Sequence, residues 1–338
     1  MPNIDVFVIG GGPAGLAAAI AARRKGMKVV VADGDRPPID KPCGEGLMPD
    51  SRSLAEKLGV HLPDSVGYGF RGIRFHGKTQ SVAADFSGGV GIGVRRTVLH
   101  LALVEAAERA GVEFRWASPV NSFDKINARW IVAADGSGSR ARKWAGLDAV
   151  KSASRRFAYR QHFAVAPWTN YMEIYWGEGC QVYVTPVDAN EVCVALVSRQ
   201  PGLRLDEALQ LHFPALRVRL PLGTETARER GAVTGNVSLR AVTRGNIALL
   251  GDASGSVDAI AGEGICLSFR QAEVLAKAMA AGDLSIYERA HPRLAFRPQL
   301  MAKTMLQLDR NQLVQSWAMS ALAARPWIFR KLLEVHVA

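Results

Sequence analysis

The apolar positions near the start of the chain predict a βαβ unit. The short apolar run Ile4–Ile9 ends in a six-residue segment that contains four glycines. An alanine-rich stretch with helical spacing follows as far as Lys25, and a second apolar run covers Val29–Ala32. A buried strand, a helix and another buried strand in this order form one parallel unit.

Between residues 37 and 135 the pattern alternates between loops and short elements. Residues 37–50 are rich in proline and glycine and predict a loop, whereas residues 66–94 mix glycines with β-formers and predict irregular strands. Thr97–Ala110 carries apolar residues at helical spacing and closes on Gly111, as a helix end often does. The other elements predicted here are a helix at Ser51–Leu58 and strands at Val112–Trp116 and Trp130–Ala134.

The second half of the chain opens with apolar positions at a period of two, from residue 157 to residue 199, which predicts an antiparallel sheet. Residues 205–220 then favour a helix and 233–243 a strand, before Asn246–Leu250 returns to the pattern of a buried parallel strand. Gly264–Ala281 and Arg293–Leu333 are predicted to be helical, with prolines at 292, 298 and 326 as punctuation.

These patterns predict an α/β protein with a parallel central sheet, an antiparallel-sheet lobe and C-terminal helices. One domain is expected to be built from residues 1–155, interrupted by a small sheet segment near 66–94, and closed by residues 241–285. The antiparallel lobe is expected at 156–240 and the C-terminal helices at 286–338. A chain of 338 residues is long enough for such a composite enzyme.

The formal net charge is +11, but Lys and Arg are scattered and form no block of five or six. No helix-turn-helix, zinc or RNA-binding signature accompanies the charge, so we expect no nucleic-acid partner. Solubility, attraction of a phosphorylated cofactor, or docking on an anionic membrane surface would each explain it.

The four cysteines show no C-x-x-C spacing, and no histidine cluster accompanies them. We therefore expect no metal site and a reducing, cytoplasmic location, with membrane contact at most peripheral. The apolar stretch after Asp5 lacks a basic leader and is broken by glycines, so it resembles neither a signal peptide nor a membrane span.

The first chemical motif is Gly10-x-Gly12-x-x-Gly15, placed between a predicted strand and a predicted helix. Glycines at these positions permit a tight turn and let the helix N-terminus approach a pyrophosphate. The second strand ends at Asp33, where a carboxylate would bind an adenosine ribose. The alternative is a plain tight turn with Asp33 on the surface, and the motif alone does not separate FAD from NAD.

Two further segments follow predicted strands. One reads Asp135-Gly136-Ser137-Gly138-Ser139-x-x-Arg142, and the other runs from Asn246 through Gly251-Asp252-Ala253 to Gly262-Glu263-Gly264 and a helix. A buried strand that ends in Gly-Asp lets a carboxylate reach the hydroxyls of a sugar-alcohol chain, and a glycine-rich helix start offers backbone N–H groups to an anion.

The three segments, in this order, resemble the fingerprints of the flavin hydroxylase superfamily, which includes aromatic hydroxylases, geranylgeranyl reductases and flavin halogenases. The resemblance covers nearly the whole chain and implies a Rossmann-like FAD-binding domain of the glutathione-reductase type. Arg96, which opens the predicted helix, matches the family's arginine near the flavin phosphate. The alternative for Arg96 is a solvent-facing helix start. The implied FAD-binding residues are Gly10, Gly12, Pro13, Ala14, Gly15, Asp33, Gly34, Cys43, Gly44, Arg95, Arg96, Asp135, Gly136, Ser139, Gly251, Asp252, Gly262, Glu263, Gly264 and Ile265.

Two details favour the geranylgeranyl reductase-like branch. Cys43-Gly44-Glu45-Gly46-Leu47 looks like the Cys-Gly-x-Gly-Leu loop of those reductases, and Gly251–Gly255 has glycine where aromatic hydroxylases usually carry histidine. The halogenase segment Trp-x-Trp-x-Ile-Pro is absent, and the reductase strand Gly-Tyr-x-Trp is represented only by Gly179–Tyr183. These departures put the substrate in doubt and leave the flavin assignment intact.

Cys43 and Glu45 are the candidate catalytic residues. A thiol in a glycine-rich loop beside a flavin would shape the pocket or hold a proton, and Glu45 would act as an acid or bind the cofactor. The alternative for Glu45 is a solvated loop residue. Aromatic residues on the predicted sheet, such as Tyr159 and Tyr183, are more often core than substrate contacts.

The resemblance implies that NAD(P)H binds transiently and reduces FAD, and that hydride then passes to a C=C bond of a small apolar substrate, such as a prenylated, lipid or polyketide-like molecule. The alternative is a monooxygenase that hydroxylates or epoxidises an apolar or aromatic substrate through a flavin hydroperoxide. A third hypothesis is a membrane-docking flavoprotein with little turnover, because the C-terminal helices combine Trp317 and Trp327 with Arg325, Arg330 and Lys331. Packing of this segment on its own core is the alternative reading.

Overall fold

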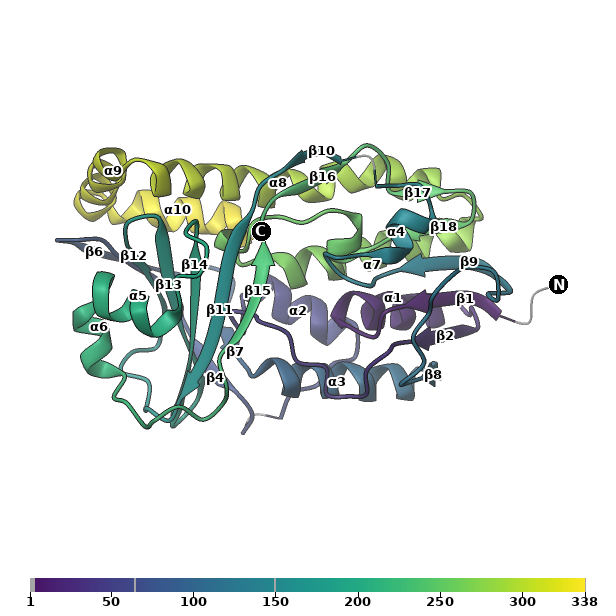
Figure 1. Ribbon diagram of the computed structural model, residues 1–338, viewed down its shortest axis with the longest axis horizontal. Helices are drawn as coiled ribbons and strands as arrows, with labels where there is room; N and C mark the ends of the chain where they lie inside the picture. Colours follow the sequence, from purple (N-terminus) through teal and green to yellow (C-terminus); the bar gives the residue numbers. More distant parts are fainter. Residues whose placement is uncertain (1–3, 64, 149, 338) are drawn as a thin grey trace.

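The computed structural model describes residues 4–63, 65–148 and 150–337. Its first layer is a six-stranded sheet in the order β17-β18-β9-β1-β2-β8, in which only β17 runs antiparallel (Figure 1). Short runs of fully buried side chains form these strands, as expected for a parallel sheet covered on both faces. The strands are β1 (Ile4–Ile9), β2 (Val29–Ala32), β8 (Glu113–Arg115), β9 (Ala128–Ala133), β17 (Thr243–Arg244) and β18 (Ile247–Leu249).

Helices α1 (Pro13–Arg23), α3 (Arg96–Arg109) and α7 (Gly264–Ala281) pack around this sheet, and α1 contacts both of the others. The inner side of α1 consists of small and branched apolar residues, so the helix lies close to its neighbours. Pro13 occupies the first turn of α1, where a missing N–H costs nothing. The predicted Rossmann-like parallel sheet with flanking helices is thus confirmed.

A seven-stranded sheet forms the second layer, in the order β15-β11-β14-β13-β12-β5-β6. All neighbours in it are antiparallel except β12 and β5, which pair in parallel. Two strands from the 66–94 segment, β5 and β6, therefore join the antiparallel lobe, whereas the other two, β4 (Tyr68–Phe70) and β7 (Gly91–Gly93), form a small separate sheet with β3 (Gly46–Leu47). The strands are β5 (Gly72–His76), β6 (Ser81–Asp85), β11 (Arg156–Phe163), β12 (Tyr171–Trp176), β13 (Cys180–Asp188), β14 (Glu191–Ser198) and β15 (Arg230–Thr234).

Both faces of this second sheet are covered, which explains why β13 and β14 are apolar almost throughout. Val182 and Val184 pack under α5 (Leu205–His212) and α6 (Pro214–Arg219), whereas Tyr183, between them, points to the opposite face. That opposite face, called here the inner face, packs on the C-terminal helices and on Ile260.

Residues 285–337 form three helices, α8 (Ser285–Arg310), α9 (Gln312–Ala324) and α10 (Pro326–Val337). Each break between these helices falls at a residue that favours a helix start. The Asn311 side chain caps α9 by accepting hydrogen bonds from the N–H groups of Leu313 and Val314, and Pro326 is the first residue of α10. Pro292 and Pro298, expected as punctuation, lie inside α8. Among the described residues, no helix is both long enough and apolar enough to cross a membrane.

Smaller elements connect the two layers. The two-residue strand β3 (Gly46–Leu47) pairs with β7, and β7 also pairs with β4, so the loop before Gly46 is held under the seven-stranded sheet. The remaining elements are α2 (Pro49–Lys57), β4 (Tyr68–Phe70), β7 (Gly91–Gly93), α4 (Arg140–Trp144), β10 (Val150–Ala153), β16 (Val237–Leu239) and the 3₁₀ turns Gly251–Ser254 and Ala259–Ala261.

Candidate active site

The turn between β1 and α1 is shaped for close approach by a ligand. Gly10 has a φ of +107°, a conformation that glycine tolerates, and a Cβ there would overlap the carbonyl oxygen of Ala134. A Cβ on Gly15 would overlap the carbonyl oxygen of Gly10. A Cβ on Gly12, which caps α1, would meet no atom within 4 Å. The turn is closed on the protein side and open at the helix N-terminus, where backbone N–H groups favour a phosphate.

Asp33, at the end of β2, faces the same turn. Its carboxylate accepts hydrogen bonds from the N–H groups of Gly11 (2.6 Å) and Asp35 (2.9 Å). A carboxylate has about four acceptor positions, so two stay available for ribose hydroxyls. The residue is half-buried, as a group at the rim of a ligand site would be.

The second and third sequence motifs lie beside the first because β1, β9 and β18 are parallel neighbours that end at one edge of the sheet. Gly251 has a φ of +59°, and a Cβ on it would lie 2.7 Å from the Cβ of Ala14. Arg142 joins the second motif to the third by donating a hydrogen bond to the carbonyl oxygen of Ala253 (3.3 Å). The three segments thus form one site.

Asp252 is exposed to solvent, yet the protein around it raises the pKa of its carboxyl by desolvation. The positive charges of Lys41 and Arg96 lower that pKa in part. A carboxyl that is both accessible and densely surrounded lies in a concave part of the surface. Arg96 is buried, and its Nε has no hydrogen-bond partner among the described residues. Lys41 was not among the predicted site residues, although its place in a proline- and glycine-rich loop next to Cys43 could have indicated a site residue.

Some predicted cofactor residues have local partners. The Asp135 carboxylate accepts the backbone N–H groups of Arg140 and Ala141 and the hydroxyl of Ser139 (2.5 Å), so it caps α4. The Arg95 guanidinium is ion-paired with Glu191 of β14, so of the two adjacent arginines only Arg96 acts on Asp252.

The remaining predicted residues occupy turns. Gly34 is exposed beside Pro119. Gly136 has a φ of +83°, and a Cβ on it would lie 3.4 Å from the Lys41 ammonium nitrogen. Gly262 ends a 3₁₀ turn with a φ of +69°, and Gly264 opens α7 where a Cβ would meet no atom within 4 Å. Ile265 packs on the main core, a position that serves folding.

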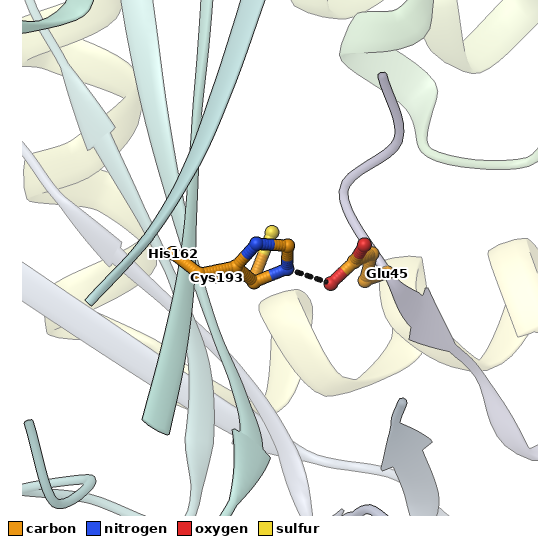
Figure 2. A group of neighbouring side chains, drawn as sticks. All are labelled: Glu45, His162 and Cys193. Atoms are coloured by element: carbon orange, nitrogen blue, oxygen red, sulfur yellow. Dashed lines mark hydrogen bonds and ion pairs between the residues drawn. The ribbon is translucent and has the colours of Figure 1, made fainter. Parts of the chain in front are cut away.

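A buried charged cluster, not expected as a unit, stands behind the Cys43 loop (Figure 2). The Glu45 carboxylate lies 2.6 Å from Nε2 of His162, and it accepts hydrogen bonds from the Arg160 guanidinium (2.8 Å) and the Arg96 backbone N–H (3.0 Å). Cys193, a residue of β14, faces the same group. Its Sγ lies 3.7 Å from the carbonyl oxygen of Cys43. Glu45 is therefore an organised buried carboxylate, and the reading of it as a solvated loop residue is wrong.

The inner-face positions of β11 and β14 explain this meeting. Arg160 and His162 are two residues apart, so both point to the inner face, and His162 pairs directly with Cys193. The Arg160 guanidinium also binds Asp40 (2.8 Å). Basic side chains at alternate positions of a predicted strand were the sequence signal for these two residues, but their carboxylate partner lies more than 100 positions away.

Glu45, His162 and Cys193 offer three ligand atoms within 4.8 Å of one another, a spacing that would suit a metal ion. The Arg160 guanidinium already occupies a carboxylate oxygen of Glu45, and its positive charge opposes a cation there. Burial raises the pKa of the Cys193 thiol well above its usual value, so it stays protonated. The cluster is chemically suited to hold and pass a proton.

The third-motif residue Glu263 meets the C-terminal helix. Its carboxylate lies 2.6 Å from Nδ1 of His336 on α10, and both side chains are largely buried. A second buried group joins β11 to the third motif: the Arg156 guanidinium lies 3.5 Å from the Asp258 carboxylate and 3.8 Å from that of Asp309 on α8. Both contacts tie the C-terminal helices to the site.

Comparisons with known proteins agree with this geometry. Residues 4–157 match the family model described as pyridine nucleotide-disulphide oxidoreductase. A menaquinone reductase of Mycobacterium tuberculosis is 28% identical, over 84% of this chain and 78% of the relative. A digeranylgeranylglycerophospholipid reductase of Thermoplasma volcanium is 27% identical, over 90% of this chain and 82% of the relative.

Solved structures show the same fold. A triple mutant of the flavin-dependent brominase Bmp2 superimposes with a TM-score of 0.85 at 16% identity, over 99% of this chain and 95% of the other. The p-nitrophenol 4-monooxygenase of Pseudomonas putida gives a TM-score of 0.81 at 18% identity, over 100% and 97%. Fold, motifs and relatives define the class of protein: the chain is an FAD-dependent oxidoreductase. Within that class its motifs resemble those of the flavin hydroxylase superfamily, and its relatives include a reductase of geranylgeranyl lipids.

The described residues fit FAD. The open N-terminus of α1 and the unpartnered Arg96 Nε suit the pyrophosphate, and Asp33 has free acceptor positions for the adenosine ribose. Asp252, accessible beside two cations, suits the ribityl hydroxyls. When bound, FAD supplies hydride chemistry, and the protein's part is to orient the substrate and move protons.

Proposed function

We propose that the protein reduces a C=C bond of an apolar, isoprenoid-containing substrate, with NAD(P)H as the electron donor for FAD. Such a reduction adds a hydride to one carbon and a proton to the other, so the chain must supply an acid. The observation that carries the proposal is the buried Glu45–His162–Arg160 cluster directly behind the Cys43 loop.

Cys43 is the half-buried member of this group, whereas Glu45, His162 and Cys193 are buried. A proton given to substrate would therefore leave from Cys43, and Glu45 with His162 would replace it. The backbone N–H of Glu45 donates to the Cys43 sulfur (3.4 Å), which stabilises a thiolate after proton loss. Arg160, whose charge is favoured by Glu45 and Asp40 against the cost of burial, holds the carboxylate in place.

The relatives support the substrate class. One is named for a quinone that carries an isoprenoid chain and the other for a phospholipid with geranylgeranyl chains.

Anaerobic single-turnover experiments test the proposal. The purified protein is reduced with NADPH or NADH, and menaquinone or a geranylgeranyl ether lipid is added while flavin absorbance is recorded. Reoxidation without oxygen, together with a product whose isoprenoid chain has gained two hydrogens by mass spectrometry, is the expected result. Reoxidation that needs oxygen and gives a product with an added oxygen atom would establish the monooxygenase instead.

A further inference from the structure

Exposed apolar side chains gather on the last three helices. Of the fifteen large hydrophobic residues that are exposed in the described part of the chain, eight lie on α8, α9 and α10. Leu313 is 84% exposed, and the two tryptophans are 74% and 60% exposed. We call this set the C-terminal surface: Phe296, Leu300, Leu313, Val314, Trp317, Trp327, Leu332 and Val335.

These helices also contribute buried residues to the core, so their exposed apolar residues form a second, separate face. Met319 of α9 and Phe329 and Leu333 of α10 are buried against the inner face of the seven-stranded sheet. Trp317 and Trp327 each lie two residues before a buried position, Met319 and Phe329, so they project from the opposite side of the helix. The C-terminal segment therefore packs on the core with one face and exposes apolar side chains on the other.

The charge around the C-terminal surface has one sign. From Pro292 to the end, the chain contains seven Lys or Arg residues, all exposed, and two acidic residues. Asp309 is buried and ion-paired with Arg199, and Glu334 is paired with Lys331. The electrostatic potential over the exposed side of these helices is thus strongly positive, and it attracts an anionic surface.

A cavity of about 430 Å³ opens between α10 and the end of β6. Phe86 and Trp327 form its apolar walls, and Arg330 and Lys331 bring two cations to its rim. Two acidic residues also line it: Asp85 is already bonded to Arg71 and Tyr171, and Glu334 is paired with Lys331. Aromatic side chains beside cations match the interfacial zone of a bilayer, where apolar chains meet phosphate head groups.

The opposite side of α10 reaches the candidate active site. His336, seven residues after Phe329 and three after Leu333, lies on the buried side of the helix and contacts Glu263. One helix therefore separates the C-terminal surface from the third FAD motif.

We propose that the C-terminal surface docks the protein on an anionic lipid bilayer, with α9 and α10 lying in the interface and lipid phosphates bound by Arg330 and Lys331. Apolar area and basic charge together give stable interfacial binding, where either alone is weak. The placement of the active site behind α10 rests on the proposed function, since a lipid substrate would then enter from the bilayer. The docking itself does not depend on turnover.

Vesicle flotation tests the docking with the full chain. The wild type is expected to float with phosphatidylcholine vesicles that contain phosphatidylserine, and less with phosphatidylcholine alone or at high salt. Trp317→Glu combined with Trp327→Glu should reduce the floated fraction by about tenfold or more. The matched control is Val218→Glu with Leu222→Glu, which places the same charges at exposed apolar positions near α6, outside the C-terminal surface.

A wild type that fails to float on anionic vesicles, or a control pair that loses as much binding as the tryptophan pair, would overturn the docking. Arg330→Gln with Lys331→Gln should remove the preference for anionic lipid while leaving part of the apolar binding, so unchanged preference would overturn the head-group assignment. Retained far-UV circular dichroism and retained flavin show that each variant is folded. Docking without anaerobic reduction of an isoprenoid would count against the proposed function alone.

Discussion

The carboxylate of Glu45 and the imidazole of His162 lie 2.6 Å apart, although 117 positions separate them in the chain. Glu45 has a φ of 58°, which costs free energy for a residue with a side chain, and the surrounding hydrogen bonds hold it there. Strain of this kind in a buried carboxylate beside a cofactor loop is typical of a functional residue.

Replacing Glu45 by Gln should slow anaerobic reduction of an isoprenoid by about 10²- to 10⁴-fold, because the carboxylate that accepts and returns the proton behind Cys43 is lost while a hydrogen-bond acceptor is kept. The rate of flavin reduction by NAD(P)H should change little. Stopped-flow absorbance separates the two steps. Glu56→Gln, at an exposed position, is the control, and equal rates in both variants would exclude Glu45 from the proton path.

Asp252→Ala should purify with little or no FAD, because the carboxylate that we expect to bind the ribityl hydroxyls is removed. Flavin retention by the wild type should also weaken as the pH falls towards the raised pKa of this carboxyl. The ratio of flavin to protein absorbance after gel filtration measures both effects. Asp124→Ala, at an exposed position, should stay yellow, and a fully occupied Asp252→Ala protein would contradict the placement of the third motif.

Arg156→Met should lower the free energy of unfolding by about 3–5 kcal/mol, since the Asp258 carboxylate would stay buried without its cation and Asp309 would keep only Arg199. Arg52→Met removes an exposed ion pair and should cost less than about 1 kcal/mol. Urea denaturation of both variants gives the comparison. Similar losses would mean that the buried cluster is not stabilising the junction of β11, α8 and the third motif.

Glu173 gives a pH-dependent contribution to stability. Burial alone would raise the pKa of its carboxyl, but hydrogen bonds with His76, Tyr175 and Trp168 outweigh burial and lower it. A folded pKa below the unfolded one stabilises the protein above the unfolded value, and the effect is lost as the pH falls through the folded pKa.

The stability difference between wild type and Glu173→Gln should therefore be largest near neutral pH and shrink in acid. Urea denaturation at neutral pH and below the pKa of an unperturbed glutamate gives the two values. A difference that does not change with pH would show that the carboxylate charge has no part in it.

Much of the nucleotide-binding layer was predictable because its determinants are local. The strand at Ile4–Ile9, the glycines at 10, 12 and 15 and the carboxylate at Asp33 lie within one βαβ unit, so sequence spacing and spatial contact coincide. The individual roles of the predicted residues towards FAD remain predictions, and Arg95 and Asp135 were found with other partners.

The sequence by itself determined the nucleotide-binding turn and the Rossmann-like layer, since a turn without side chains and a strand of apolar residues depend on short-range sterics and hydrophobicity. Tertiary structure alone decided that β5 pairs with β12 and that Glu45 meets His162 and Cys193. Sheet register and the packing of a loop under a distant strand depend on long-range burial, which no local pattern records. For the same reason only the fold showed that one side of α10 faces Glu263 while the other presents the C-terminal surface.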